Sequence, residues 1–216
     1  MGYTSDQLLD IYQRLDDYFG PLNWWPAESP FEMIVGAVLT QNTNWKNVEK
    51  SIDSLKRADL LNFKSLLHMP VEQLAELIRS SGYYNLKARR LKNLLEMVAK
   101  DYDGDLSLFL SEDPYVARDA LLQVKGIGPE TADSILLYAG GHPTFVVDAY
   151  THRILFRHGL IPESCDYQTM HELFMDNLDH DTAMFNQYHA LMVRTAKQFC
   201  KKGEPLCDAC PLQPLL

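Results

Sequence analysis

The chain has 216 residues, 46% of them hydrophobic and 23% charged, which is the composition of an ordinary globular protein with one large domain or two small lobes. No apolar run reaches the roughly 18 residues of a membrane-spanning helix, and the N-terminal segment lacks the basic and apolar regions of a secretory signal, so we expect a soluble cytoplasmic protein without a membrane partner. The formal net charge of −9 argues against binding nucleic acid through overall charge, because contact with phosphate then depends on local Lys and Arg residues.

Apolar residues recur at helical spacing almost throughout the chain, and no segment alternates as a strand does. We therefore expect an all-α protein. A capping serine followed by proline, Ser29-Pro30, is typical of a helix start. In chain order, the first apolar stripes run from Leu8 to Phe19, from Phe31 to Val38, from Val48 to Leu55, from Leu74 to Ile78 and from Leu91 to Val98.

Four cations gather where the last of these stripes begins: Lys87, Arg89, Arg90 and Lys92. They form either a local basic patch, which can coexist with an acidic whole, or an ordinary solvated helix face.

The second half of the chain begins with another cap and proline, Asp113-Pro114, and its helix leads into Gly126-Ile127-Gly128 and a further helix. Gly140-Gly141-His142-Pro143 then breaks the pattern strongly enough to mark a domain boundary. Helices around 149–158, 166–178 and 183–198 lead into a cysteine-rich tail. The expected lobes are residues 22–142, and residues 1–21 together with 143–216.

The turn Gly126-Ile127-Gly128 lies between two helices and is the first feature with chemistry in it. Two glycines let the backbone turn tightly and approach a neighbour, and Pro129 leaves the first amides of the next helix facing outward. Such amides and the positive end of the helix dipole favour a phosphate. A plain helix hairpin, whose glycines serve only the turn, is the alternative interpretation.

Four segments in the same order extend this observation to most of the chain. They are Leu122-x3-Gly126-Ile127-Gly128-x2-Thr131-Ala132 followed by Val146-Val147-Asp148, Phe31-Glu-x6-Leu39-Thr-Gln41, Gly82-Tyr-Tyr-Asn85-x-Lys87-Ala88, and Cys200-x6-Cys207-x2-Cys210-Pro211. Together they resemble the endonuclease III superfamily of helix-hairpin-helix DNA glycosylases. The resemblance implies a two-lobed all-α fold with the active site in the cleft between the lobes, and a monomer that acts on double-stranded DNA with a damaged base.

The resemblance also assigns a catalytic pair, Glu130 and Asp148. Bifunctional members carry lysine at the first position, because an amine can form a Schiff base with the sugar and lead to strand cleavage. Glutamate cannot, so we expect a monofunctional enzyme in which Asp148 stabilises the positive charge of the transition state and orients or deprotonates water. The plain alternative is that Asp148 caps the following helix, and both roles can hold together.

Other positions of the resemblance concern contact with DNA. Tyr83 matches the residue that wedges into the duplex, and Gln41 matches the residue that fills the space left by a flipped base; a packed tyrosine and a helix-ending glutamine are the structural alternatives. Lys125, Gly126, Gly128 and Arg153 are expected to face phosphate. Tyr150 departs from the family, which has histidine there.

All three tryptophans lie near the second helix, in Trp24-Trp25-Pro26 and at Trp45. Their faces would attract a cationic alkylated base, and with Glu130 they resemble the 3-methyladenine DNA glycosylase branch. Aromatic packing between two lobes is the structural alternative. A glycosylase for mismatched thymine, uracil or another lesion, and a non-catalytic DNA-binding module, are the competing functions.

The tail carries three cysteines, Cys200, Cys207 and Cys210, whose spacing resembles the family's four-cysteine loop for a 4Fe–4S cluster. The fourth position, 216, is Leu216, and Cys165 is far away in the sequence. Zinc would need a histidine, and none follows Cys210. The expectation is an iron–sulfur cluster, with unliganded cysteines as the alternative.

Overall fold

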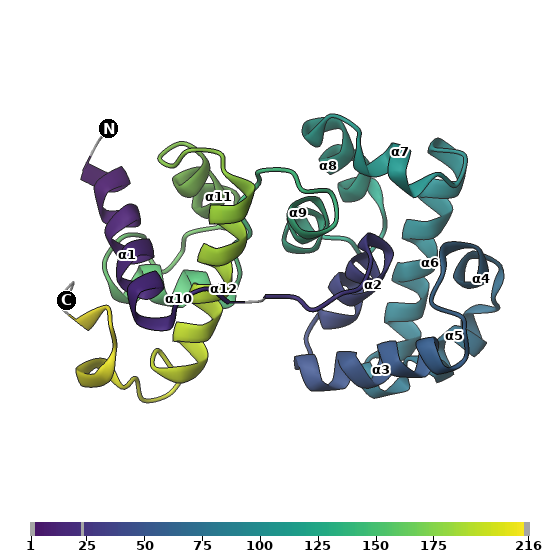
Figure 1. The fold of residues 1–216 in the computed structure, drawn as a ribbon, viewed down its shortest axis with the longest axis horizontal. Coiled ribbons are helices and arrows are strands. Elements are labelled where there is room, and N and C mark those ends of the chain that lie inside the picture. The colour runs from purple at the N-terminus through teal and green to yellow at the C-terminus, as the bar shows by residue number, and fades with distance from the viewer. Residues whose placement is uncertain (1–2, 23, 214–216) are drawn as a thin grey trace. The chain divides into compact units, whose positions relative to one another are not determined.

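The computed structural model describes residues 3–22 and 24–213, and every regular element in this part of the chain is a helix. The prediction of an all-α fold is confirmed. The chain divides into two compact units (Figure 1): a terminal unit, Met1–Pro26 with Pro143–Leu216, and a central unit, Ala27–His142. None of the described helices is long and apolar enough to cross a membrane.

The central unit surrounds α2, whose residues 31–39 are buried except for the half-buried Met33. Helices α3, α6 and α9 pack around it. Ser29 caps α2 by accepting a hydrogen bond from the Glu32 amide at 3.2 Å, as expected of the Ser-Pro start. The helices of this unit are α2 (Pro30–Thr40), α3 (Trp45–Arg57), α4 (Phe63–His68), α5 (Val71–Leu77), η1 (Arg79–Ser81), α6 (Tyr84–Asp101), α7 (Leu106–Leu110), α8 (Pro114–Gln123) and α9 (Pro129–Tyr138).

The terminal unit is organised by α12, which packs against both α1 and α10. Its Tyr188 is fully buried and donates a hydrogen bond to the Leu8 carbonyl at 2.8 Å, which ties the two ends of the chain together. Phe145 stacks on Phe174 with ring centroids 3.7 Å apart. The helices are α1 (Tyr3–Phe19), α10 (Ala149–Arg157), α11 (Tyr167–Met175), α12 (Thr182–Gln198) and η2 (Cys207–Ala209).

Residues 24–26 belong to the terminal unit, whereas the sequence analysis placed them in the central lobe. Two contacts with α12 explain the difference. The Leu22 amide donates to the Gln187 side chain at 2.9 Å, and the Trp24 ring lies against Lys197. The segment therefore follows α12 before the chain enters the central unit.

Candidate active site

Asp148 is the residue before α10 and caps it. One carboxylate oxygen, Oδ1, accepts hydrogen bonds from the Tyr150 amide at 2.9 Å, the Thr151 amide at 2.7 Å and the Thr151 hydroxyl at 3.0 Å. The capping role and a chemical role therefore use different atoms, because Oδ2 receives none of these bonds.

The other oxygen, Oδ2, lies 3.6 Å from Nε2 of His189, on α12. This distance is too long for a hydrogen bond but short enough for an ion pair when the imidazole is protonated. The two side chains are only 11% and 7% exposed. Burial alone would raise the pKa of Asp148, but the His189 contact and the Thr151 hydrogen bonds outweigh it and lower that pKa below 3.8. Asp148 is thus a buried carboxylate that stays charged at neutral pH.

His189 is the residue that sequence reasoning missed. It lies in the buried stripe of α12 among apolar neighbours, where a single histidine gives no signal of its partner. The edge of its ring faces Trp24, with centroids 6.2 Å apart.

A layer of rings and cations covers α10 beside this pair. The Lys197 ammonium lies 5.8 Å from the ring centroid of Trp24 and 5.8 Å from that of Tyr150. The Arg153 guanidinium lies 5.2 Å from the Tyr150 ring and donates from Nε to the Cys200 carbonyl at 2.7 Å. Arg153 therefore joins α10 to the end of α12.

The two glycines of the hairpin turn between α8 and α9 have different structural roles. Gly126 has φ +98°, and a Cβ there would collide with the Arg90 side chain. Gly128 has an ordinary φ of −100° and open space around the position of a Cβ. It precedes α9 without a side-chain cap, and Pro129 follows. Gly126 is needed for the turn, whereas Gly128 leaves the first amides of α9 uncovered.

Gln41 is bound into this hairpin. Its amide nitrogen donates to the Gly126 carbonyl at 3.2 Å and to the Thr131 hydroxyl at 2.9 Å, and its amide oxygen accepts from Arg90 Nη1 at 2.5 Å. The side chain that was expected to fill a gap in DNA is thus bound within the protein and holds the hairpin turn. Lys125 and Glu130, on either side of the turn, are exposed.

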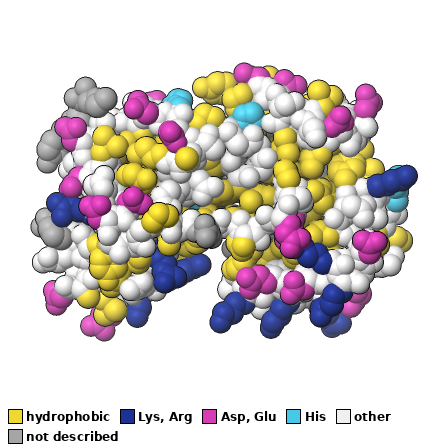
Figure 2. Space-filling view, in the orientation of Figure 1, with side chains coloured by type: hydrophobic (Ala, Val, Ile, Leu, Met, Phe, Trp, Pro, Cys, Tyr) yellow, Lys and Arg dark blue, Asp and Glu magenta, His cyan; other side chains and the backbone are white. Residues whose placement is uncertain are grey.

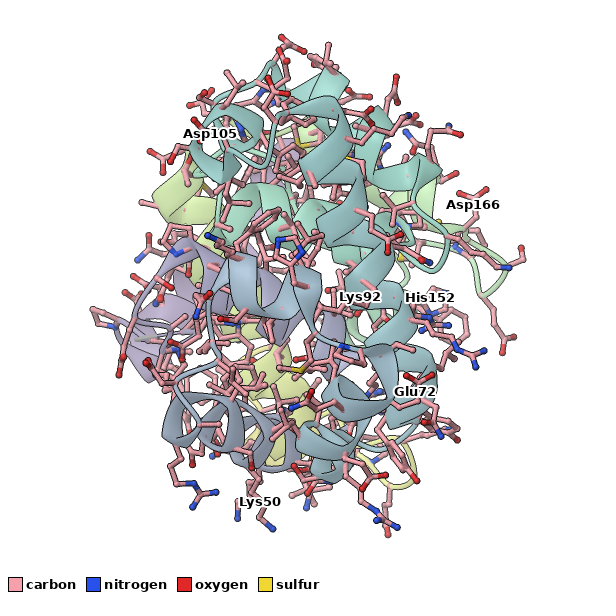
Figure 3. The ribbon with its side chains drawn as sticks, turned by 90° about the vertical axis from the view of Figure 1, so that its right-hand side faces the viewer. Lys50, Glu72, Lys92, Asp105, His152 and Asp166 are labelled. Carbon is pink, nitrogen blue, oxygen red and sulfur yellow. The ribbon has the colours of Figure 1, made fainter. Side chains whose placement is uncertain are left out.

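The interpretation of residues 87–92 as one basic patch is wrong for two of its members. Lys87 is 1% exposed and donates to the Leu39 and Ser81 carbonyls at 2.8 and 2.6 Å. Burial, followed by the nearby Arg90 charge, lowers the pKa of Lys87 to about 8. Lys92 donates to the Leu66, Leu67 and Met69 carbonyls at the end of α4 (Figure 3). Both amines bind backbone carbonyls because the short preceding helices leave carbonyl groups without helical partners.

Exposed cations of the central unit also lie on α3, which carries Lys46, Lys50 and Arg57 on its surface, and Arg89 of α6 is exposed as well. Figure 2 shows dark blue side chains along this lower edge of the unit, and Figure 3 labels Lys50 there.

Tyr83 is 71% exposed and has a left-handed φ of +47° just before α6, a conformation that costs a non-glycine residue free energy and persists only where its surroundings hold it. Trp45 is the half-buried first residue of α3, in the central unit, whereas Trp24, Trp25 and Pro26 lie in the terminal unit.

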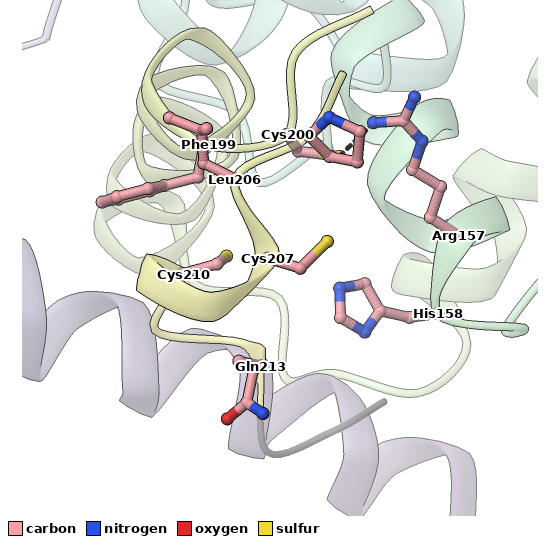
Figure 4. A pocket seen from close by; sticks show the side chains of 9 residues that line it. Arg157, His158, Phe199, Cys200, Leu206, Cys207, Cys210 and Gln213 are labelled. Atoms are coloured by element: carbon pink, nitrogen blue, oxygen red, sulfur yellow. Dashed lines mark hydrogen bonds between the residues drawn. The ribbon is translucent and has the colours of Figure 1, made fainter. Parts of the chain in front are cut away.

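The three tail cysteines line a single pocket with His158, at the end of α10 (Figure 4). Arg157 Nη1 donates to Cys200 Sγ at 3.3 Å. Nδ1 of His158 is buried and has no hydrogen-bond partner among the described residues. Cys165 lies before α11 and does not line this pocket. Three thiols and an imidazole are a donor set that fits a soft metal centre, and the Arg157 cation lies beside them.

An all-α chain with a glycine hairpin before one helix and a buried aspartate capping another has the structure of a helix-hairpin-helix DNA glycosylase of the endonuclease III superfamily. A model of the HhH-GPD superfamily of base excision DNA repair proteins matches residues 35–180, and the chain belongs to this superfamily.

One relative in sequence and two solved structures are similar to most of the chain. A provisionally named DNA repair glycosylase of Methanocaldococcus jannaschii is 46% identical over 209 residues, which are 96% of this chain and 94% of the relative. The H. pylori 3-methyladenine DNA glycosylase, solved with 1,N6-ethenoadenine, is 31% identical with a TM-score of 0.77, covering 90% of this chain and 97% of that one. A non-covalent endonuclease III–DNA complex has a TM-score of 0.83 at 24% identity, covers 98% and 94% of the two chains, and shows the shared fold.

Proposed function

We propose that the chain is a monofunctional DNA glycosylase that hydrolyses the N-glycosidic bond of an alkylated purine such as 3-methyladenine in double-stranded DNA. The observation that carries the proposal is that the two carboxylate oxygens of Asp148 have different contacts. Its Oδ1 accepts three hydrogen bonds from the start of α10, while its Oδ2 accepts none of them and stays available for the reaction.

Cleavage of an N-glycosidic bond builds positive charge on the sugar. A carboxylate that is already ionised and held in a buried site can stabilise this charge without reorganising. Oδ2 of Asp148 would also accept a proton from the attacking water. His189 positions this oxygen, and it keeps the carboxyl group deprotonated because it lowers the pKa of Asp148.

The absence of lyase chemistry rests on Glu130. A carboxylate at this position cannot form a Schiff base with the sugar, so the product is an abasic site in an intact strand. Lys197 is the amine to control for in the terminal unit, because it lies against the Tyr150 ring two residues after Asp148.

The choice of an alkylated purine is supported by Trp24 and by the H. pylori relative, whose solved structure holds a modified adenine. The face of Trp24 already receives the Lys197 ammonium, so it can attract a cation. An N3-methylated adenine carries positive charge and leaves readily, which removes the need for a strong general acid. Trp24, Trp25 and Pro26 of the terminal unit are the residues that we propose to contact the base.

Contact with DNA is assigned to the hairpin. The amides after Gly128 face phosphate, with Lys125 beside them, and such contacts carry no sequence information. Gln41 and Arg90 support the turn, and Tyr83 is exposed as a wedge would need to be. Arg153 acts through α10 in this proposal, since its guanidinium is bound to the Cys200 carbonyl. We propose that the protein acts as a monomer.

When bound at Cys200, Cys207 and Cys210, an iron–sulfur cluster would cross-link the tail and add its binding free energy to the stability of the terminal unit.

The test is base release from three duplexes that carry 3-methyladenine, uracil or a thymine–guanine mismatch. We expect release of the methylated base, and Trp24→Leu should reduce it about fivefold to tenfold, whereas Trp24→Phe keeps an aromatic face and most of the activity. Faster release of uracil or thymine would replace the alkylpurine assignment. DNA binding without any base release would favour the non-catalytic module.

A further inference from the structure

Two segments of the terminal unit line the pocket at the cysteine tail. Cys200 follows the end of α12, Cys207 is the first residue of η2, and Cys210 directly follows η2. The opposite wall is the end of α10, which contributes Arg157 and His158. In Figure 4 the His158 ring lies on the same side of the pocket as the Cys207 side chain.

His158 is the one feature of this pocket that packing does not explain. Its Nδ1 is buried, and none of the described residues provides a hydrogen-bond partner. A buried ring nitrogen without a partner forfeits the hydrogen bond it would make in water, and coordination of a metal would restore a partner.

The loop itself is one ligand short. Its spacing resembles a four-cysteine cluster loop, and position 216 is Leu216, outside the described residues. We propose that His158 supplies the fourth protein ligand, so that Cys200, Cys207, Cys210 and His158 together hold a four-iron, four-sulfur cluster.

The spacing of the loop favours a cluster over a single ion. Cys200-x6-Cys207-x2-Cys210 resembles the family's cluster loop, and in the described part of the chain no group of three or more His, Cys, Asp or Glu side chains is already arranged around one metal ion. In a cluster each protein ligand binds a different iron, so the four donors need not converge on one point. Arg157 Nη1, 3.3 Å from Cys200 Sγ, adds a hydrogen bond to a ligand sulfur, which tunes such centres.

The experiment compares metal content and spectra of full-length protein purified without oxygen. Wild type should carry about four iron and four sulfide ions per chain with visible absorption, and its reduced form should show a nitrogen coupling from imidazole in pulsed paramagnetic resonance. His158→Leu should hold about half of this iron or less. His158→Cys should keep the cluster and lose the nitrogen coupling.

Two controls separate ligation from folding. His152→Leu changes a histidine of the same helix that bonds the Glu163 carbonyl, and Cys165→Ser changes a cysteine away from the pocket. Both should keep wild-type iron, and circular dichroism should show that every variant is folded. A His158→Leu protein with wild-type iron and an unchanged spectrum would overturn the proposal. So would zinc in place of iron, or wild type that stays iron-free after reconstitution with ferrous iron and sulfide.

Discussion

His189 Nε2 lies 3.6 Å from Oδ2 of Asp148, the carboxylate oxygen that receives none of the hydrogen bonds by which Asp148 caps α10. The two residues come from different helices of the terminal unit, and α10 packs directly on α12. Mutations at this pair can therefore distinguish the capping function of Asp148 from its charge.

Asp148→Asn should reduce base release about 10²-fold to 10³-fold, because it removes the charge that stabilises the transition state. Asparagine caps helices as well as aspartate does, so the affinity for DNA should change little and stability should fall only by the contribution of the lost charge. Single-turnover release of 3-methyladenine and thermal unfolding measure the two effects. Asp166→Asn, at the exposed cap of α11, is the matched control and should keep full activity. If Asp148→Asn released the base as fast as wild type, Asp148 would not be the catalytic carboxylate.

His189→Leu should change the pH dependence of the reaction. Burial raises the pKa of Asp148, and the His189 contact is the main influence that lowers it. Without His189 the pKa of Asp148 rises, so the carboxylate becomes protonated at a higher pH. The acid limb of the rate–pH profile should therefore move to higher pH, and His189→Gln should give an intermediate shift. An unmoved acid limb would show that His189 does not act on Asp148.

The same pair contributes to stability in a defined pH range. Because the folded-state pKa of Asp148 lies below its ordinary value of 3.8, its stabilising contribution is fully present above that value and is lost as the pH falls through the folded-state pKa. The difference in unfolding free energy between wild type and Asp148→Asn should accordingly shrink as the pH falls below about 4. Denaturant unfolding at several pH values checks this, and a difference that grows towards low pH would contradict it.

The two hairpin glycines should respond differently to alanine. Gly126→Ala places a Cβ against Arg90 in a left-handed conformation and should cost about 1–3 kcal/mol of stability. Gly128→Ala has open space and an ordinary φ, so stability should stay within about 0.5 kcal/mol. Its methyl group would stand before the phosphate-facing amides and weaken binding to damaged and undamaged duplexes alike. A loss confined to damaged DNA would contradict the phosphate role.

Borohydride during turnover should trap no covalent protein–DNA adduct, since Glu130 offers no amine. Strand integrity after the reaction is the second readout, and the abasic strand should stay intact. If an adduct forms, Lys125→Ala and Lys197→Ala identify its source, because the first lysine lies beside the hairpin and the second beside Tyr150. An adduct that disappears with either variant would make the enzyme bifunctional.

The helices that sequence periodicity located are those with enough turns to show a stripe, such as α6 with its buried Leu91, Leu94 and Leu95. It did not locate α4 and α7, which have 6 and 5 residues and are defined by their caps, Asn62 and Asp105. The sequence predicted Asp148 because the helix-capping pattern and the position of the family's catalytic aspartate coincide in this residue. The sequence did not predict His189 or His158, because the groups that they face lie on other elements. Neither residue type nor spacing reveals which groups face each other after folding. The backbone carbonyl partners of Lys87 and Lys92 could not be predicted from charge alone for the same reason.

Helix α10 has 9 residues and begins at the residue after Asp148, so at 1.5 Å per residue it is about 14 Å long. Its far end is held by Arg157, which donates to the Lys201 and Lys202 carbonyls at 2.8 and 3.3 Å. A helix this short does not bend appreciably, so a displacement of the cysteine loop rotates or shifts the whole of α10. The orientation of the carboxylate is therefore determined jointly by its local cap and by an anchor on the far side of the unit.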